Sequence, residues 1–432
     1  MIIINWKRVF TSMYYFLKLI FIGKKYDVVF VSSTAFNRGE NGENILFKPM
    51  VDYCKKNGLK YAVFEETYFK SYIDYGVNKK SIPLDFISII RILLNKIYNL
   101  IHKKPTTADQ IYFQDLKISK ILKNLFFRKF NSKVYITLIW NNVTLWRCVN
   151  PSACVVDYQH AYIYDGEEGG HMLNGSPPRV KVDNDVAALV HGERYKRILI
   201  DYDKSGFYSE ENVITVGMNK ILRTHKQIPV NNKKILFTLQ LTPDFPEKEV
   251  NDFYVEIVEK LIGANANFLI ENNYEIIFKH HPRYSTYYCP DINLQHDFIS
   301  FDNKTPLSDL LNTASLHMTF HSTSAFDAAI IGIPTIFIDM HEPFSPNEMF
   351  LKQYEYPCKD LVIKNYKDLK SILITIDNKE IFNSYCDNVY QWSKEFYHDF
   401  DELVFGDFIS SKIIESKDIQ QKLIEKRKVN LQ

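Results

Sequence analysis

The sequence lacks the cysteine patterns of metal-bound and disulfide-bonded proteins. Its six cysteines are scattered over 432 residues, with no CxxC or CxxH arrangement. Such arrangements supply the ligands of structural zinc sites, and closely spaced cysteines form the disulfide frameworks of small secreted domains. We therefore expect a protein of the reducing cytoplasm, and the sequence predicts no metal site.

An excess of charge of one sign is also absent. The chain has 53 Lys and Arg residues against 51 Asp and Glu residues, which gives a formal net charge of +2. This balance provides no global positive field for nucleic acid, although small basic patches can still gather a phosphorylated ligand. Nucleic acid is therefore not expected as a partner.

The N-terminal segment has no apolar run long enough to span a membrane. Its apolar and aromatic residues are interrupted by Lys7, Arg8 and Lys18, and no A-x-A-like cleavage site follows. The pattern predicts a basic, aromatic helix with two possible placements. It could lie on an anionic membrane surface, with Lys24 and Lys25 helping, or pack against the first domain. We expect a cytoplasmic protein or one that is peripheral on the inner face of the cytoplasmic membrane.

What the sequence does contain is a repeated alternation of strand-like and helix-like segments. In the first half, strands are expected at 27–31, 60–66, 133–140, 153–159 and 186–192, and helical patterns at 45–56, 84–101 and 107–129. In the second half, strands are expected at 235–240, 275–281, 298–301, 315–320 and 334–339, and helices at 247–262, 306–312 and 323–331. This alternation favours the α/β class, with parallel sheets covered by helices.

The length fits two domains, each with its own core. A polar stretch at 222–233 separates the two series of strands. We predict an N-terminal acceptor-binding domain at 1–225, a C-terminal nucleotide-sugar-binding domain at 226–400, and a helix at 401–432 that packs back on the first domain.

Two polar motifs follow strands of the second half. "KHHPR" (279–283) ends one strand, and "HSTSAFD" (321–327) comes after another. Ligands of open parallel sheets bind beyond the carboxyl ends of the strands, so the two motifs are expected to converge. His281 precedes a proline, which favours extended backbone and directs the ring toward the crevice. Lys279 and Arg283 add positive charge, whereas His280 is interpreted as a structural neighbour.

The second motif predicts the start of a helix. Ser322 is a good N-cap, and Thr323 and Ser324 place hydroxyl groups in the first turn. Free backbone N–H groups and hydroxyls at a helix N-terminus form a phosphate site. Taken alone, the segment also fits an ordinary Ser-capped buried helix, and the "HP" pair fits a turn histidine bonded to backbone. Read together, the motifs assign donor binding to the following residues: Lys279, His281, Arg283, Ser322, Thr323 and Ser324.

The motif pair resembles a known group of enzymes. His281-Pro282 followed by Ser322-Thr323 is similar to the "HP" and "S-S/T" motifs of bacterial GT-B sialyltransferases and polysialyltransferases. Related motifs occur in capsule Kdo transferases and in teichoic-acid CDP-glycerol transferases. The similarity covers about 235–340 at motif level and the first domain only in architecture. It implies two Rossmann-like domains facing each other across a cleft, with C-terminal helices crossing back to the first domain. It also implies that His281, Ser322 and Thr323 hold the phosphate of a cytidine nucleotide donor.

The general base is sought on the acceptor side, because a sugar hydroxyl must lose its proton during transfer. The segment "DYQHAYIYDGEEGGH" (157–171) follows a strand. Its "YDGEEGG" is similar to the acidic-plus-glycine motif that carries the base in the sialyltransferases, whereas "QHA" is similar to the "QHG" of capsule proteins. His160, Asp165 and Glu168 are therefore the candidates, and a solvated acidic loop fits the same residues.

These patterns together predict a glycosyltransferase. It would transfer a sugar from a nucleotide-activated donor, CMP-linked acidic sugars included, to a growing capsule or lipopolysaccharide glycan, free or lipid-linked. The resemblance implies inversion without a metal, and no cofactor besides the donor is expected. Three alternatives stay open, namely a CDP-glycerol or ribitol phosphotransferase, a nucleotide-sugar epimerase, and a non-catalytic protein that binds glycan or nucleotide.

Overall fold

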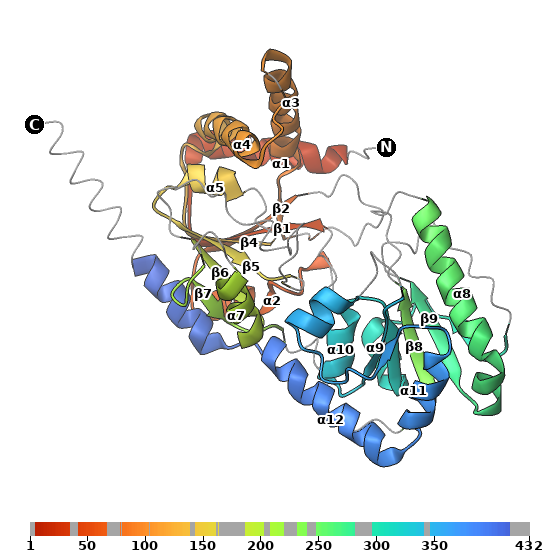
Figure 1. Cartoon of the computed structure of the whole chain (residues 1–432). Helices are drawn as coiled ribbons and strands as arrows, with labels where there is room; N and C mark the ends of the chain where they lie inside the picture. The colour runs from red at the N-terminus through yellow and green to blue at the C-terminus, as the bar shows by residue number, and fades with distance from the viewer. Residues whose placement is uncertain are drawn as a thin grey trace, which may run out of the picture. The chain divides into compact units, whose positions relative to one another are not determined.

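The computed structural model of the chain consists of two compact units (Figure 1). It describes residues 5–34, 42–66, 78, 80–102, 104–138, 143–160, 163, 186–202, 208–219, 231–239, 248–280, 296–340 and 346–414, with backbone alone at 108–109, 248–254 and 347–348. The first unit comprises Met1–Asn219 together with His398–Gln432, and the second comprises Lys220–Tyr397. Each unit is described by itself.

The first unit is built on a seven-stranded parallel sheet of order β3-β2-β1-β4-β5-β6-β7. Its strands are β1 (Lys24–Ser33), β2 (Tyr61–Glu66), β3 (Ile82–Pro83), β4 (Phe130–Leu138), β5 (Cys154–Tyr158), β6 (Val186–Val190) and β7 (Val213–Thr215). In the centre, Val29 of β1 lies opposite Ala62 of β2 and Tyr135 of β4. The runs 28–31 and 186–190 are buried throughout, as expected for parallel strands that are covered on both faces.

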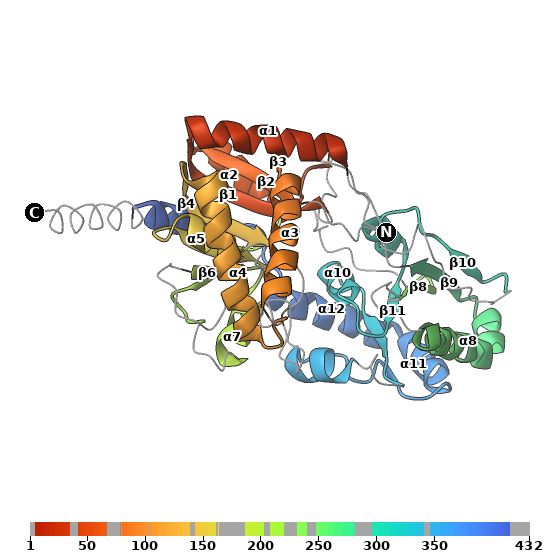
Figure 2. The same cartoon turned by 90° about the horizontal axis from the view of Figure 1, so that it is seen from above.

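Helices cover both faces of this sheet. They are α1 (Trp6–Ile22), α2 (Lys48–Lys56), α3 (Asp85–Ile101), α4 (Ala108–Leu122), the π-helical η3 (Lys123–Phe127), α5 (Val143–Val149), α7 (Glu193–Tyr202) and a helix at 402–414. Figure 2 shows α1, α3 and α4 in front of the sheet. Under this layer an aromatic core forms, in which Trp146 contacts Phe127 and Phe130.

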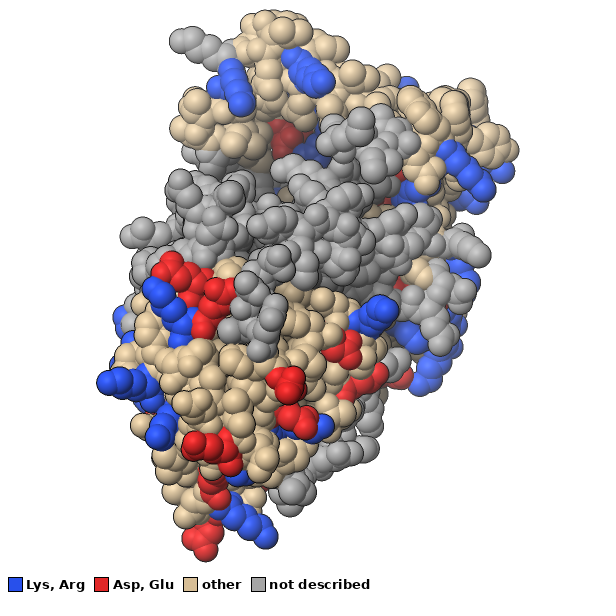
Figure 3. All heavy atoms as spheres, turned by 90° about the vertical axis from the view of Figure 1, so that its right-hand side faces the viewer, with Lys and Arg blue, Asp and Glu red and all other residues tan. Residues whose placement is uncertain are grey.

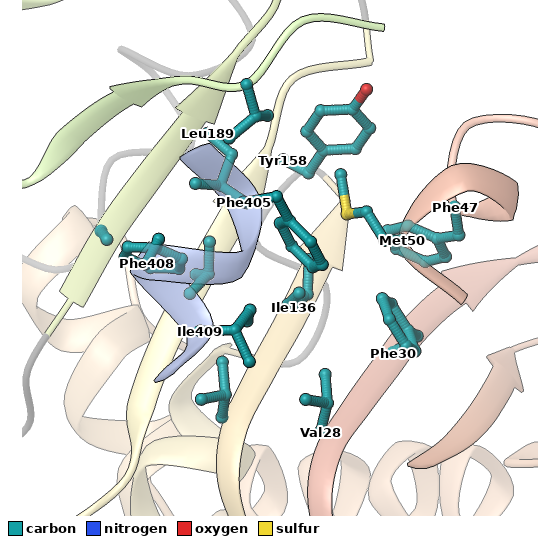
Figure 4. Packing of buried hydrophobic residues seen from close by; sticks show 14 of the residues in the cluster. Val28, Phe30, Phe47, Met50, Ile136, Tyr158, Leu189, Phe405, Phe408 and Ile409 are labelled. Atoms are coloured by element: carbon teal, nitrogen blue, oxygen red, sulfur yellow. The ribbon is translucent and has the colours of Figure 1, made fainter. Parts of the chain in front are cut away.

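The C-terminal helix belongs to the core of the first unit. Phe405, Phe408 and Ile409 join a buried cluster with Met50 of α2 and Ile136 of β4 (Figure 4). The C-terminal segment thus crosses back to the first domain.

Gly217 allows the returning chain to approach closely. The backbone N–H of Met218 donates to His398 O at 2.9 Å, and the N–H of Phe400 donates to Met218 O at 2.8 Å. Gly217 has φ +75°, and a Cβ there would overlap the carbonyl oxygen of Asp399. Only glycine meets both requirements.

The N-terminal helix α1 packs on the first unit, which was one of its two possible placements. Its inner face buries Val9, Phe16 and Leu19. Arg8 also points inward, donating to Glu65 at 2.8 Å and to Asp85 at 3.1 Å. Arg8 therefore adds no charge to the outer surface of the helix, because two buried carboxylates surround its guanidinium.

The second unit is a six-stranded parallel sheet of order β10-β9-β8-β11-β12-β13. Its strands are β8 (Lys234–Leu239), β9 (Glu275–His280), β10 (Ile299–Phe301), β11 (Leu316–Thr319), β12 (Thr335–Ile338) and β13 (Val362–Ile363). Its helices are α8 (Lys248–Glu271), α9 (Leu307–Thr313), α10 (Ser324–Ile330), the π-helical η6 (Asn347–Gln353), α11 (Asp368–Ile376) and α12 (Lys379–Phe396). The rings of Phe326 in α10 and Trp392 in α12 stack, with 4.8 Å between their centroids. This contact anchors α12 to α10.

The predicted α/β class is confirmed, with one parallel sheet in each unit. Element boundaries differ in places. The helix expected at 247–262 continues to Glu271, because Ala266 and Leu269 extend its buried face. The pattern at 107–129 divides into α4 and η3. The elements β3, α5, α7, β13 and η6 are among those that were not predicted.

Candidate functional site

The winding of the second sheet marks one position for ligand binding. From β8 the chain proceeds through β9 to β10 on one side, and β11, β12 and β13 lie on the other. The topological switch point therefore falls between β8 and β11. Ligands of doubly wound sheets bind at the carboxyl ends of the strands beside such a point.

A chain of hydrogen bonds occupies the interior at this switch point. His317 Nε2 lies 2.9 Å from the hydroxyl of Thr238, and Nδ1 lies 3.0 Å from the hydroxyl of Thr335. The Thr238 hydroxyl lies 2.8 Å from that of Ser324 at the start of α10. These side chains are buried, so the bonds link β8, β11 and β12 to the helix in a low-dielectric environment.

His317 is neutral in this environment. Burial lowers the pKa of its imidazole to about 3. A neutral imidazole has one donor and one acceptor nitrogen, so one hydroxyl accepts from the ring and the other donates to it. Because the ring fixes the Thr238 hydroxyl, it also orients the Ser324 hydroxyl that lies against it.

The start of α10 differs from the expected open helix N-terminus. Thr323 is the N-cap, and its side chain makes no capping hydrogen bond. The N–H of Ser324 donates to the Ser322 hydroxyl at 3.2 Å. The N–H groups of Ala325 and Phe326 donate to Ser322 O and Thr323 O. The prediction of free N–H groups is thus wrong for these three residues, because a bond to the Ser322 hydroxyl and two i to i−3 backbone bonds close the first turn.

The three hydroxyl residues of this motif have different surroundings. Ser324 is buried and faces Thr238, whereas Ser322 and Thr323 are half-buried at the turn. Ser322 and Thr323 are thus the more accessible pair. Asp327, on the same helix, is exposed.

The end of β9 contains Lys279 and His280. Lys279 is buried, and its ammonium donates to Thr305 O at 2.6 Å and to Asp302 O at 3.4 Å. Burial lowers its pKa, which the nearby Asp302 partly offsets. These contacts use two of the three donors of the ammonium. Its assignment to donor binding stays a prediction.

His280 is packed rather than solvated. Its ring is nearly parallel to that of Phe301, with 5.9 Å between centroids, and burial lowers its pKa to about 4. Neither ring nitrogen has a hydrogen-bond partner among the residues that the structure describes. The neighbouring candidates His281 and Arg283 lie outside the described residues, as do Asp165 and Glu168.

His160 is the candidate base that the structure describes. It follows β5 at the carboxyl edge of the first sheet and is half-buried. Next to it, Gln159 accepts from the backbone N–H of His191 at 2.8 Å, which ties this loop to β6. The switch point of the first sheet lies between β1 and β4, and β5 is the next strand. His160 is therefore one strand away from it.

The described residues offer neither a metal centre nor a membrane span. In the described part of the chain, no three His, Cys, Asp or Glu side chains lie close enough together to hold a metal ion. None of its helices combines the length and the apolarity that crossing a bilayer requires.

Comparisons with known proteins agree on the fold. No protein-family model matches the chain, and no curated protein is similar to it in sequence. Among solved structures, the glycotransferase of kitacinnamycin has a TM-score of 0.52 at 9% identity, covering 90% of this chain and 100% of its own. A variant of the wall teichoic acid polymerase TagF has a TM-score of 0.50 at 13% identity, covering 98% and 100%. The UDP-GlcNAc 2-epimerase of Methanocaldococcus jannaschii reaches 0.49 at 13% identity, covering 83% and 94%.

The chain has the GT-B fold. This follows from its two parallel-sheet α/β units and from the whole-chain likeness to glycosyltransferases. The expected GT-B fold is thereby shown. The narrower resemblance to sialyltransferases stays a prediction.

The sequence reading did not single out His317. In "SLHMTF" (315–320) the polar residues Ser315, His317 and Thr319 alternate with apolar ones. Polar residues with period two on a strand of a fully covered sheet must be paired inside the protein. That spacing, together with Thr238 and Thr335 on other strands, was the signal available.

Proposed function

We propose that the protein is a glycosyltransferase that transfers a sugar from a nucleotide-activated donor to a growing bacterial surface glycan. The donor is a CMP-linked sugar, and the glycan belongs to a capsule or lipopolysaccharide. Transfer proceeds with inversion and needs no metal. The acceptor is a glycan or lipid-linked glycan at the inner face of the cytoplasmic membrane.

One observation supports this proposal above the others. At the switch point of the second sheet, the Thr238–His317–Thr335 bonds hold the first turn of α10, where Ser322 and Thr323 remain half-buried. A leaving nucleotide gains negative charge in the transition state, and fixed donors stabilise that charge without reorganising. Ser322 and Thr323 are therefore assigned to the donor phosphate, together with His281, which lies outside the described residues.

The base is assigned to the loop after β5. His160 is at the carboxyl edge of the first sheet, and Asp165 and Glu168 follow it in sequence. An imidazole or carboxylate there takes the proton of the acceptor hydroxyl. Replacing the residue that acts as the base should abolish transfer while nucleotide binding persists. The variants His160→Ala, Asp165→Asn and Glu168→Gln are therefore compared in an assay of sugar transfer and in one of nucleotide binding.

Nucleotide binding is the direct test. Isothermal titration with CMP, CDP, UDP and GDP is expected to favour a cytidine nucleotide. His281→Ala should raise its Kd by about tenfold to a hundredfold, because a charge-assisted bond is lost. Asp327→Ala, on the exposed side of α10, serves as the matched control. An unchanged Kd in His281→Ala would remove the phosphate role of that residue.

A second activity fits the same fold. TagF, whose structure resembles the whole chain, is a wall teichoic acid polymerase, and a CDP-glycerol or ribitol donor would use the same phosphate site. Turnover assays with CMP-sugars and with CDP-glycerol separate the two. Nucleotide binding without turnover of any donor, across several acceptors, would instead indicate a non-catalytic binding protein.

A further inference from the structure

The outer face of α1 is as apolar as its inner face. Five large side chains recur there at intervals of three or four residues, so they form one stripe along the helix. They are Trp6, Phe10, Tyr14, Leu17 and Phe21, with exposed fractions of 60, 58, 68, 44 and 76%. A helix that is apolar on both faces is normally covered on both. Here the first unit covers only one.

The stripe continues onto the helices beside α1. On α3, Leu93, Ile97 and Leu100 are 52, 52 and 86% exposed, and on α4, Phe113 and Ile121 are 50 and 43% exposed. The helices α1 and α3 contact each other, as do α3 and α4, and together they form the layer seen from above in Figure 2. We call this layer, α1 with α3 and α4, the outer helical layer.

The same layer concentrates positive charge. The helices α1, α3 and α4 contain seven Lys or Arg against three Asp, although the whole chain has a net charge of only +2, and Lys24, Lys25, Lys123 and Lys129 flank them. Arg8, one of the seven, is buried between two carboxylates. Of those three acids, Asp85 is bound to Arg8 and Asp115 lies 3.0 Å from Arg91. In Figure 3 the upper part of the molecule, which holds this layer, shows mainly blue and tan.

A basic groove lies at the C-terminal end of the apolar stripe. It is open, has a volume of about 940 Å³, and includes Ile22 and Gly23. Four lysines line it: Lys24, Lys25, Lys60 and Lys129. No acidic side chain is among the described residues that form it. An anionic headgroup is the kind of ligand that such a groove attracts.

We infer that the outer helical layer is a docking surface for a membrane rich in anionic lipids. The aromatic stripe of α1 would enter the interfacial region, where Trp and Tyr rings are favoured, and the lysines would contact lipid phosphates. A second copy of the chain is a poor occupant, because pairing through this face would bring the lysines of both copies together. The inference deepens the proposed function, which places a lipid-linked acceptor at the membrane.

Vesicle flotation tests the docking directly. The full chain is mixed with vesicles of phosphatidylcholine alone or of phosphatidylcholine with phosphatidylglycerol, without donor or acceptor. We expect binding to the anionic vesicles to be roughly tenfold or more stronger and to weaken at high salt. Because no transfer is measured, failure of the proposed enzyme activity leaves this result unaffected, and the reverse also holds.

Matched variants assign the binding to the layer. Phe10→Glu, Tyr14→Glu and Phe21→Glu together should lower vesicle binding at least about tenfold. The control carries Ile270→Glu, Ile374→Glu and Leu403→Glu, at positions 54, 54 and 80% exposed outside the layer, and should bind normally. Because all six positions are exposed, both variants are expected to fold, and unfolding curves check this.

The contribution of the lysines and the insertion of the helix into the membrane are tested separately. Replacing Lys7, Lys18, Lys24 and Lys25 by Gln should remove the preference for anionic vesicles. In a Trp140→Phe background, Trp6 emission should shift to the blue on binding, and the shift should vanish when Trp6 is also replaced by Phe, because the two remaining tryptophans, Trp146 and Trp392, are already buried.

Three results would overturn the inference. They are absence of flotation with anionic vesicles, undiminished binding of the triple-Glu variant, and a lipid-free dimer that the triple-Glu variant abolishes. The last result would assign the face to self-association.

Discussion

The two units wind their sheets in the same way but bury their polar groups differently. In the first unit a buried cation is matched by carboxylates, since Arg8 bonds to Glu65 at the end of β2 and to Asp85 at the start of α3. In the second unit two buried imidazoles, those of His280 and His317, are instead kept neutral, beside the buried Lys279 that donates to backbone carbonyls. Charge pairing and charge suppression are thus two solutions to the same desolvation cost.

The two kinds of buried group are destabilised by different changes. A buried ion pair fails when one partner is removed, because the other charge is left in a low dielectric. A buried neutral histidine fails in acid, because only the unfolded chain can take up the proton. The first unit should therefore be sensitive to loss of an ion-pair partner, and the second to acid.

The largest effect is expected from acid. The unfolded pKa of a histidine is 6.5, whereas burial lowers that of His280 to about 4 and that of His317 to about 3. Between pH 6.5 and 4.5 the unfolded state therefore binds more protons, and the second unit should lose roughly 5 kcal/mol of unfolding free energy. Urea unfolding followed by hydrogen exchange of peptides from each unit measures this. His317→Gln should flatten the dependence in the second unit, and an unchanged slope would contradict the assignment.

Removing Arg8 should give the next largest effect. Arg8→Ala leaves Glu65 and Asp85 without their buried cation, and should destabilise the first unit by about 3–5 kcal/mol. Denaturant unfolding of the variant is compared with Lys7→Ala, whose side chain is exposed and whose loss should cost less than about 0.5 kcal/mol. Equal effects of the two substitutions would show that the buried pairs contribute nothing.

Breaking the hydrogen-bond chain of the second unit should lower the free energy of unfolding somewhat less than removing Arg8 does. His317→Ala leaves the hydroxyls of Thr238 and Thr335 without their partner and opens a cavity, at a cost of about 2–4 kcal/mol. Because Ser324 loses its orientation, nucleotide affinity should also fall. His296→Ala, at a half-buried histidine of the same unit, should change neither property. Unchanged nucleotide affinity in a folded His317→Ala variant would show that the hydrogen-bond chain does not contribute to nucleotide binding.

The smallest stability effect is expected at the turn before α10. Ser322→Ala removes the hydroxyl that accepts from Ser324 N–H and should cost about 1 kcal/mol. Its effect on the nucleotide Kd should exceed this if Ser322 also binds the donor phosphate. Titration of Ser322→Ala and Thr323→Ala, beside thermal unfolding, distinguishes the two roles. A loss of stability with an unchanged Kd would leave Ser322 as a cap alone.

Much of the fold was predictable because it rests on local patterns. Apolar runs such as 28–31 and 186–190 are long enough for strands and too short for helices, and their spacing requires helical crossovers. The motif at 321–327 was correctly placed between β11 and α10. The state of its N–H groups was not predicted, because these groups bond to Ser322 and Thr323 within a tight first turn.

Side-chain partners that come from distant strands could not be read in advance. Nothing local pairs Arg8 with Asp85, which is 77 residues away, so the sequence left two placements open for this helix. Likewise, nothing near Gly217 in the sequence indicates that residues 398–400 pass against it.

The sequence by itself determined the α/β class, the two series of strands and the polar motifs at their carboxyl ends. Periodicity and turn residues act over a few neighbours, so they are legible in one dimension. The tertiary structure decided which polar groups meet, namely Arg8 with its carboxylates and His317 with the hydroxyls of Thr238 and Thr335. It also left the outer stripe of α1 uncovered. Those outcomes depend on contacts between segments far apart in the chain, and desolvation makes each of them specific.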